Sequence, residues 1–157
     1  IITILGTLER HYKSLYLLGS QKDSLMTTER NLKSTFPGLQ IVGRYVGYYP
    51  KNIEKNVVEA IRKASPTMVL ISDGINGGNL WSYRKRQQFD SSIMLYSKDI
   101  FKIFSKQKKR VSNEVFEKGG EIWQEIIRNP LKIFLIFPFI WFNILLLWYK
   151  IFKRNLQ

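Results

Sequence analysis

Short apolar runs alternate with amphipathic segments along much of the chain. Residues 15–18 are apolar and are followed at once by a Gly-Ser pair. In the next segment, apolar side chains recur near helical spacing among polar ones, which predicts a helix with one buried face. These side chains are Leu25, Met26, Leu32 and Phe36. A second apolar run at 39–42, closed by Gly43 and Gly47, completes a strand–helix–strand unit.

The same alternation continues after this unit. Apolar residues on one face predict a helix that begins near Pro50. Residues 67–72 then predict a buried strand, residues 80–88 a helix and residues 92–96 a fourth strand. Strands that recur about every 25 residues are typical of repeated βα units. We therefore expect an α/β fold, a Rossmann-like parallel sheet flanked by helices. The apolar residues 1–8 fit either a strand or a helix.

Ligands of such sheets lie beyond the carboxyl ends of the strands. The most distinctive segment there is the glycine-rich turn 73–79, which follows the third strand directly. Its glycines would let backbone amides approach a phosphate, and the next helix start adds a positive dipole end. The turn matches neither the Walker loop nor the GxGxxG fingerprint, so an ordinary loop is the alternative. Asp73 could bind a ribose hydroxyl or act as a base, or it could simply stabilise the turn.

The composition limits which partners and which metal sites the chain can have. Lys and Arg number 25 against 12 Asp and Glu, a formal net charge of +13, which suits a polyanionic partner. With no cysteine and with His11 as the single histidine, thiolate and histidine metal sites are excluded and a Ser-His-Asp triad is disfavoured. No Asp-x-Asp pair is present, so no divalent metal is expected. No nucleic acid is expected either, because no RNA-binding stacking signature accompanies the charge.

The character of the chain changes after residue 98. Residues 98–110 are basic with interleaved apolar side chains, and residues 114–127 predict an amphipathic helix. Residues 133–149 carry no charge. As a helix they would extend about 25 Å, close to the lower limit for crossing a bilayer. We therefore divide the chain into a Rossmann-like domain, 1–112, and a helical C-terminal appendage, 113–157.

The apolar segment of the appendage is expected to contact anionic membrane lipid. Its aromatic residues and flanking lysines suit the membrane interface. The residues expected to contact lipid are Ile133, Phe134, Phe137, Trp141, Leu145, Trp148 and Tyr149. Lying in one leaflet and crossing the bilayer both remain open, although Pro138 and Asn143 weaken a straight span. Burial in a homo-oligomer is the alternative.

Several of these stretches resemble the WecG/TagA/CpsF glycosyltransferase family, bacterial enzymes of cell-surface polysaccharide assembly. The specific match is LYLLGS at 15–20 and FPGLQIVGRYVGYY at 36–49, with the family's spacing between them. VLISDGINGGNLW at 69–81 lies where the family has a VGxGxPKQExW loop, and KKR at 108–110 where it has a basic pair. The resemblance extends to about residue 132.

This resemblance implies an inverting transfer of a sugar, such as N-acetylmannosamine, from a UDP-sugar donor. The acceptor would be a polyprenyl-diphosphate-linked sugar at the cytoplasmic face of the bacterial cell membrane, with no metal cofactor. Another envelope-assembly protein would be an alternative partner to a second copy of the chain. The residues expected to bind the nucleotide sugar or its diphosphate are Gly19, Ser20, Gly47, Tyr48, Asp73, Gly74, Asn76, Gly77, Asn79, Lys109 and Arg110.

Some family positions differ in this chain. The Pro-Lys-Gln-Glu of the loop is replaced by Asn-Gly-Gly-Asn at 76–79, the family's Phe-Asp by Phe101 and Lys102, and an appendage arginine by Glu125. The family's proposed aspartate base belongs to a part that we expect to precede Ile1, so Asp73 is the one catalytic candidate. The alternative function is a catalytically inactive, membrane-anchored nucleotide-sugar-binding or adaptor module.

Overall fold

A parallel sheet forms the centre of the first of two units, Ile1–Lys109 and Arg110–Gln157, which are described separately. The structure is a computed structural model that describes residues 1–89, 91–109, 134 and 136–153. The strand order is β2-β1-β3-β4, and every neighbouring pair is parallel. The strands are β1 (Ser14–Leu18), β2 (Gln40–Tyr45), β3 (Met68–Ile71) and β4 (Ile93–Tyr96). The predicted parallel sheet is confirmed.

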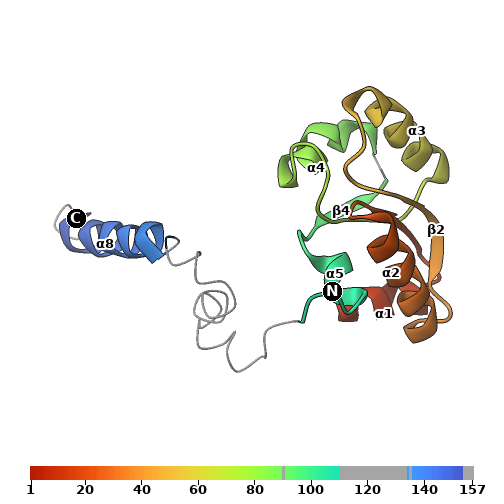
Figure 1. The fold of residues 1–157 in the computed structure, drawn as a ribbon, viewed down its shortest axis with the longest axis horizontal. Coiled ribbons are helices and arrows are strands. Elements are labelled where there is room, and N and C mark those ends of the chain that lie inside the picture. Colours follow the sequence, from red (N-terminus) through yellow and green to blue (C-terminus); the bar gives the residue numbers. More distant parts are fainter. Residues whose placement is uncertain (90, 110–133, 135, 154–157) are drawn as a thin grey trace. The chain divides into compact units, whose positions relative to one another are not determined.

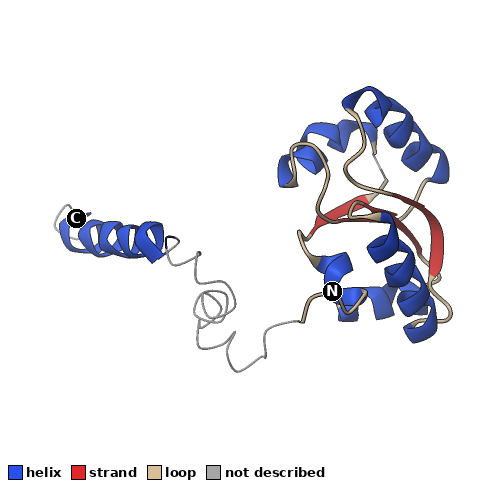
Figure 2. Cartoon of the chain, viewed as in Figure 1, coloured by secondary structure: helices blue, strands red, loops and turns tan. Residues whose placement is uncertain are grey.

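Helices cover both faces of this sheet (Figures 1 and 2). One face carries α1 (Ile2–Arg10), α2 (Lys22–Thr35) and α5 (Ile100–Phe104). The other face carries α3 (Glu54–Ala64) and α4 (Asn79–Lys85), with the short 3-10 turns η1 (Lys51–Ile53) and η2 (Arg86–Gln88). The ambiguous first residues therefore form a helix, and the flanked sheet is the predicted architecture.

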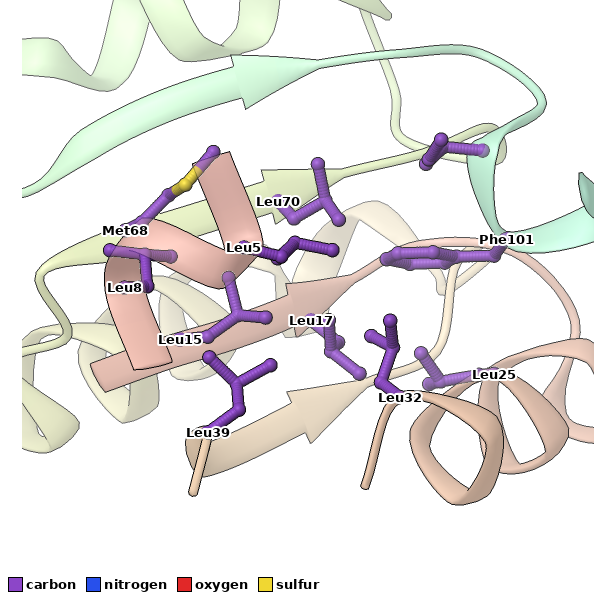
Figure 3. Close-up of a cluster of buried hydrophobic side chains, with 11 residues drawn as sticks. Leu5, Leu8, Leu15, Leu17, Leu25, Leu32, Leu39, Met68, Leu70 and Phe101 are labelled. Atoms are coloured by element: carbon purple, nitrogen blue, oxygen red, sulfur yellow. The ribbon is translucent and has the colours of Figure 1, made fainter. Parts of the chain in front are cut away.

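Alternating side chains of the two central strands build two separate cores. Leu15 and Leu17 of β1 pack with Leu70 of β3 in one cluster with side chains of α1, α2 and α5 (Figure 3). The intervening residues, among them Leu18 and Ile71, pack on the opposite face against α3 and α4. Side chains of a strand point to opposite faces in turn, so two continuous apolar runs supply both layers.

Two details differ from the sequence interpretation. Met26 was expected on the buried face of its helix, but it is 47% exposed, whereas Leu25 and Leu32 are buried. Successive side chains of a helix point about 100° apart, so Met26 points away from the face on which Leu25 lies. On that inner face, Thr28 is buried between Leu25 and Leu32. Gly43 does not close a strand; it lies within β2 beside Tyr16, where a side chain would overlap the tyrosine ring.

In the second unit, the structure describes α8 (Ile136–Lys153). Residues 140–150 are all exposed, and Pro138 stands in the first helical turn, where proline is tolerated. In the portions of the chain that are described, no helix is long and apolar enough to cross a membrane. The expected helix at 114–127 and the boundary of the appendage lie outside the described residues, and membrane contact stays a prediction.

Candidate functional site

The loops that follow β1, β2 and β3 are joined to one another by backbone hydrogen bonds. The amide of Ser20 donates to the carbonyl of Asp73 at 2.6 Å, and the amide of Gly47 donates to the carbonyl of Ser20 at 2.7 Å. The amide of Tyr48 donates to the carbonyl of Gly74 at 2.6 Å. Three strand ends are thereby fixed as one surface at the carboxyl edge of the sheet.

Two glycines make this close approach feasible. A Cβ atom at Gly47 would lie 2.8 Å from both the Asp73 carbonyl oxygen and the Ser20 amide nitrogen. Gly74 has φ +84°, and a Cβ there would lie 2.6 Å from the ring of Tyr48. The tyrosine ring therefore rests on bare backbone, and the residue as a whole remains 62% exposed. This leaves an aromatic surface beside the glycine-rich turn.

The Asp73 carboxylate is the centre of the polar contacts at this edge. Its Oδ2 accepts a hydrogen bond from the Tyr48 hydroxyl at 2.7 Å and lies 3.0 Å from the ammonium nitrogen of Lys102. Its Oδ1 accepts from the Ser72 hydroxyl at 3.0 Å. The side chain of Asp73 is only 7% exposed. Both oxygens of a buried carboxylate are thus occupied by donors.

These contacts decide the protonation state of the carboxylate. Burial acts to raise the pKa of Asp73, but hydrogen bonds from Tyr48, Lys102 and Ser72 outweigh it, so the pKa lies below its ordinary value. The hydrogen bond to Asp73 raises the pKa of Tyr48 in return. The same carboxylate also raises the pKa of Lys102. Asp73 is therefore an ionised hydrogen-bond acceptor at neutral pH, and an ionised Lys102 faces it.

Lys102 was not singled out from the sequence as a site residue, and neither were its neighbours. Its ammonium also lies 3.6 Å from Asp99 Oδ1, while Lys108 binds Asp99 Oδ2 at 2.7 Å. The hydrogen bond from Lys108 lowers the pKa of Asp99. The basic character of residues 98–110 pointed to this region, but only the fold shows that Lys102 meets a carboxylate from another strand end.

The residues predicted to bind a nucleotide sugar fall into three groups. The structure brings six of them together at the strand ends: Gly19, Ser20, Gly47, Tyr48, Asp73 and Gly74. Asn76, Gly77 and Asn79 are exposed further along the glycine-rich turn. Lys109 is exposed at the end of the first unit, and Arg110 lies outside the described residues. The ligand roles of all of them stay predictions.

Ser20 is the most unusual member of the first group. It is fully buried, it has φ 61°, and its hydroxyl has no hydrogen-bond partner in the structure. A buried hydroxyl without a partner costs free energy. Its backbone amide and carbonyl nevertheless hold the loops of β2 and β3, so its position is determined by the backbone.

Metal binding has no support in the part of the chain that the structure covers. There, no three acidic or histidine side chains are grouped so that they could hold a metal ion. Asp73 and Asp99 are each paired with lysine instead. A reaction without a metal stays a prediction.

The chain is similar to a known bacterial enzyme and to one protein family. Over 130 residues the chain is 22% identical to an N-acetylglucosaminyldiphosphoundecaprenol N-acetyl-beta-D-mannosaminyltransferase of Bacillus spizizenii. The match covers 83% of this chain and 50% of that enzyme, so the chain spans about half the length of the curated relative it matches. The model of the Glycosyl transferase WecG/TagA/CpsF family matches residues 1–156. A match of this extent establishes that the chain belongs to the WecG/TagA/CpsF family of glycosyltransferases.

Proposed function

We propose that this chain acts in the transfer of a sugar from a UDP-sugar to a polyprenyl-diphosphate-linked acceptor during cell-surface polysaccharide synthesis. The donor sugar would be N-acetylmannosamine or a close relative, transferred with inversion and without a metal. Family membership supports glycosyl transfer. The name of the Bacillus spizizenii relative supports the transferred N-acetylmannosamine and the lipid-diphosphate-linked acceptor.

The observation that carries the proposal is the assembled carboxyl edge. Tyr48 offers an exposed aromatic ring, Gly74 offers backbone without a side chain, and Lys102 offers a cation within the same set of contacts. A nucleoside diphosphate combines an aromatic base with two or more negative charges, and it matches both properties. Cations that neutralise the leaving diphosphate would stabilise the transition state of transfer.

The acceptor would be met at the cytoplasmic face of the cell membrane. The exposed apolar side chains of α8 include Phe137, Trp141, Leu145, Trp148 and Tyr149. An exposed apolar helix next to basic residues suits an anionic lipid surface. Carbonate extraction compared with salt washing tests this contact. Full release by salt would contradict insertion and leave electrostatic binding, whereas a stable oligomer in the absence of lipid would favour burial between copies.

The activity is tested by following transfer from labelled UDP-sugars to a short-prenyl diphosphate-linked N-acetylglucosamine acceptor. UDP-N-acetylmannosamine is expected to be the best donor, and the product should have inverted anomeric configuration. Addition of a chelator should leave the rate unchanged. No transfer from any donor in a broad panel would refute the enzymatic function.

A second function is favoured by the state of Asp73. Because its two oxygens already accept hydrogen bonds and its pKa is lowered, it is a poor general base in this arrangement. A missing base costs roughly 10²- to 10⁴-fold in rate. The chain would then be a membrane-anchored module that binds a nucleotide sugar without turnover. Saturable UDP binding together with absent transfer would select this alternative.

A further inference from the structure

The position of Lys102 is determined by packing that lies well away from its ammonium group. Its neighbour Phe101 is fully buried in the core. Two side chains of α2 hold the backbone of α5: the Thr28 hydroxyl donates to the carbonyl of Phe101 at 2.9 Å, and the Asn31 amide donates to the carbonyl of Phe104 at 2.7 Å. The helix that carries Lys102 is therefore fixed before any ligand binds.

The ammonium of Lys102 has capacity that the internal contacts do not use. It carries three N–H donors, and it faces one oxygen of Asp73 at 3.0 Å and one of Asp99 at 3.6 Å. The side chain remains 37% exposed. The Tyr48 hydroxyl and the Lys102 ammonium both approach the same oxygen, Asp73 Oδ2, so the two groups lie next to each other.

The surrounding charge favours an anion. Five lysines lie between residues 98 and 109, against the two carboxylates of Asp73 and Asp99. Asp99 is already bound by Lys108 at 2.7 Å. The segment that carries Lys102 therefore has a net positive charge, which favours a compact group with at least two negative charges.

We propose that Lys102 binds the diphosphate of the nucleotide ligand and that Asp73 is the positioning residue that holds its ammonium in place. This inference rests on the proposed function, because it assigns the cation of that same site. Both oxygens of Asp73 are already occupied, and this suits a positioning role better than proton abstraction. The competing explanation is that Lys102 only neutralises a buried carboxylate.

The experiment measures binding of UDP, uridine and inorganic diphosphate to the full chain by isothermal titration calorimetry at low salt. Lys102→Met should weaken UDP and diphosphate binding by about tenfold or more, which corresponds to the loss of one charge-assisted hydrogen bond. Uridine binding should change little. Lys102→Arg should retain most of the affinity. Lys33→Met, which removes another lysine that is paired with a carboxylate, should have no effect on binding.

Asp73→Asn separates positioning from simple electrostatics. Removing a negative charge beside an anionic ligand would by itself strengthen binding. If Asp73 positions Lys102, the variant binds UDP about threefold more weakly. Stronger binding would overturn the positioning role.

The outcomes distinguish this inference from the proposed function. Equal UDP binding by Lys102→Met and the wild type, with both proteins folded by circular dichroism, overturns the role of Lys102 and leaves the proposed function standing. Loss of diphosphate binding in Lys102→Met, combined with no preference for UDP over inorganic diphosphate in the wild type, supports the role of Lys102 and refutes the nucleotide donor. A wild type that binds neither compound refutes both.

Discussion

Polar groups stabilise the sheet both where its strands begin, at the amino edge, and where they end, at the carboxyl edge. The two edges use different kinds of polar group. At the amino edge, the Ser14 hydroxyl accepts from the Thr67 amide at 3.0 Å, and the Ser92 hydroxyl donates to the Pro66 carbonyl at 2.5 Å. These are neutral groups. At the carboxyl edge, the central group is the buried carboxylate of Asp73, which is bound to a lysine.

We interpret this difference as a division between stability at the amino edge and ligand binding at the carboxyl edge. A hydrogen bond between a neutral hydroxyl and the backbone satisfies a polar group at a strand end but provides no charge for a ligand. A buried charge is costly, and buried charged groups with perturbed pKa values cluster at functional sites. We therefore expect substitutions at the amino edge to change only stability, and substitutions at the carboxyl edge to change stability and ligand binding together.

The largest effect is expected at Gly47. In Gly47→Val the new side chain would collide with the backbone of Ser20 and Asp73, and the free energy of unfolding should fall by about 3 kcal/mol. Equilibrium urea unfolding measures this change.

Gly6→Ala is the matched control, since its Cβ would meet only the Phe36 ring at 3.7 Å. That variant should be at least as stable as the wild type, because alanine favours a helix interior. A tolerated valine at Gly47 would contradict the close approach of the loops.

Asp73→Ala is expected to have the next largest effect. It removes the acceptor for Tyr48, Ser72 and Lys102 at once, and the free energy of unfolding should fall by about 2 kcal/mol. UDP binding should weaken in the same variant. Urea unfolding and calorimetry measure the two quantities. Lower stability with unchanged UDP binding would make the carboxyl edge no different from the amino edge.

Ser14→Ala tests the amino edge. Loss of the hydroxyl that meets Thr67 should lower the free energy of unfolding by about 1 kcal/mol. UDP binding, measured on protein that is fully folded at the assay temperature, should stay at the wild-type value. A clear loss of binding would show that the two edges do not divide stability from function.

The smallest expected effect is a pH dependence of stability. It should be present at the carboxyl edge and absent at the amino edge. Because the pKa of Asp73 is lowered by folding, its stabilising contribution is complete above the unfolded pKa of about 3.9 and is lost as the pH falls through the folded pKa. The stability difference between the wild type and Asp73→Asn should therefore be larger at pH 7 than at pH 3. The difference for Ser14→Ala should not change with pH. An equal difference for Asp73→Asn at both pH values would mean that the charge of Asp73 adds no stability.

The sheet and half of the site could be predicted from the sequence because both depend on local patterns. Apolar runs indicated the strands, and the parallel topology placed the residues after the third strand, beginning with Asp73, at the carboxyl edge. Tyr48 was identified through the resemblance to the family. Lys102 could not be assigned in this way. Its contact with Asp73 depends on how α5 packs against α2. Thr28 of α2 holds α5 through a hydrogen bond, but in the sequence it is indistinguishable from an exposed polar residue of a helix. The exposure of Met26 was missed for a related reason, since spacing alone did not say which side of α2 faces the core.

The strand order has a consequence for how such a site can change. From β1 the chain moves outward to β2, then returns past β1 to β3, so the direction of winding reverses between the two central strands. Helix α2 follows β1 on one face, and α4 follows β3 on the opposite face. Such a topological switch point sets where a ligand can enter, whatever residues line it. Under the proposed function, altered residues at 76–79 would change which compound is bound, while the place of binding would be inherited from the winding of the chain.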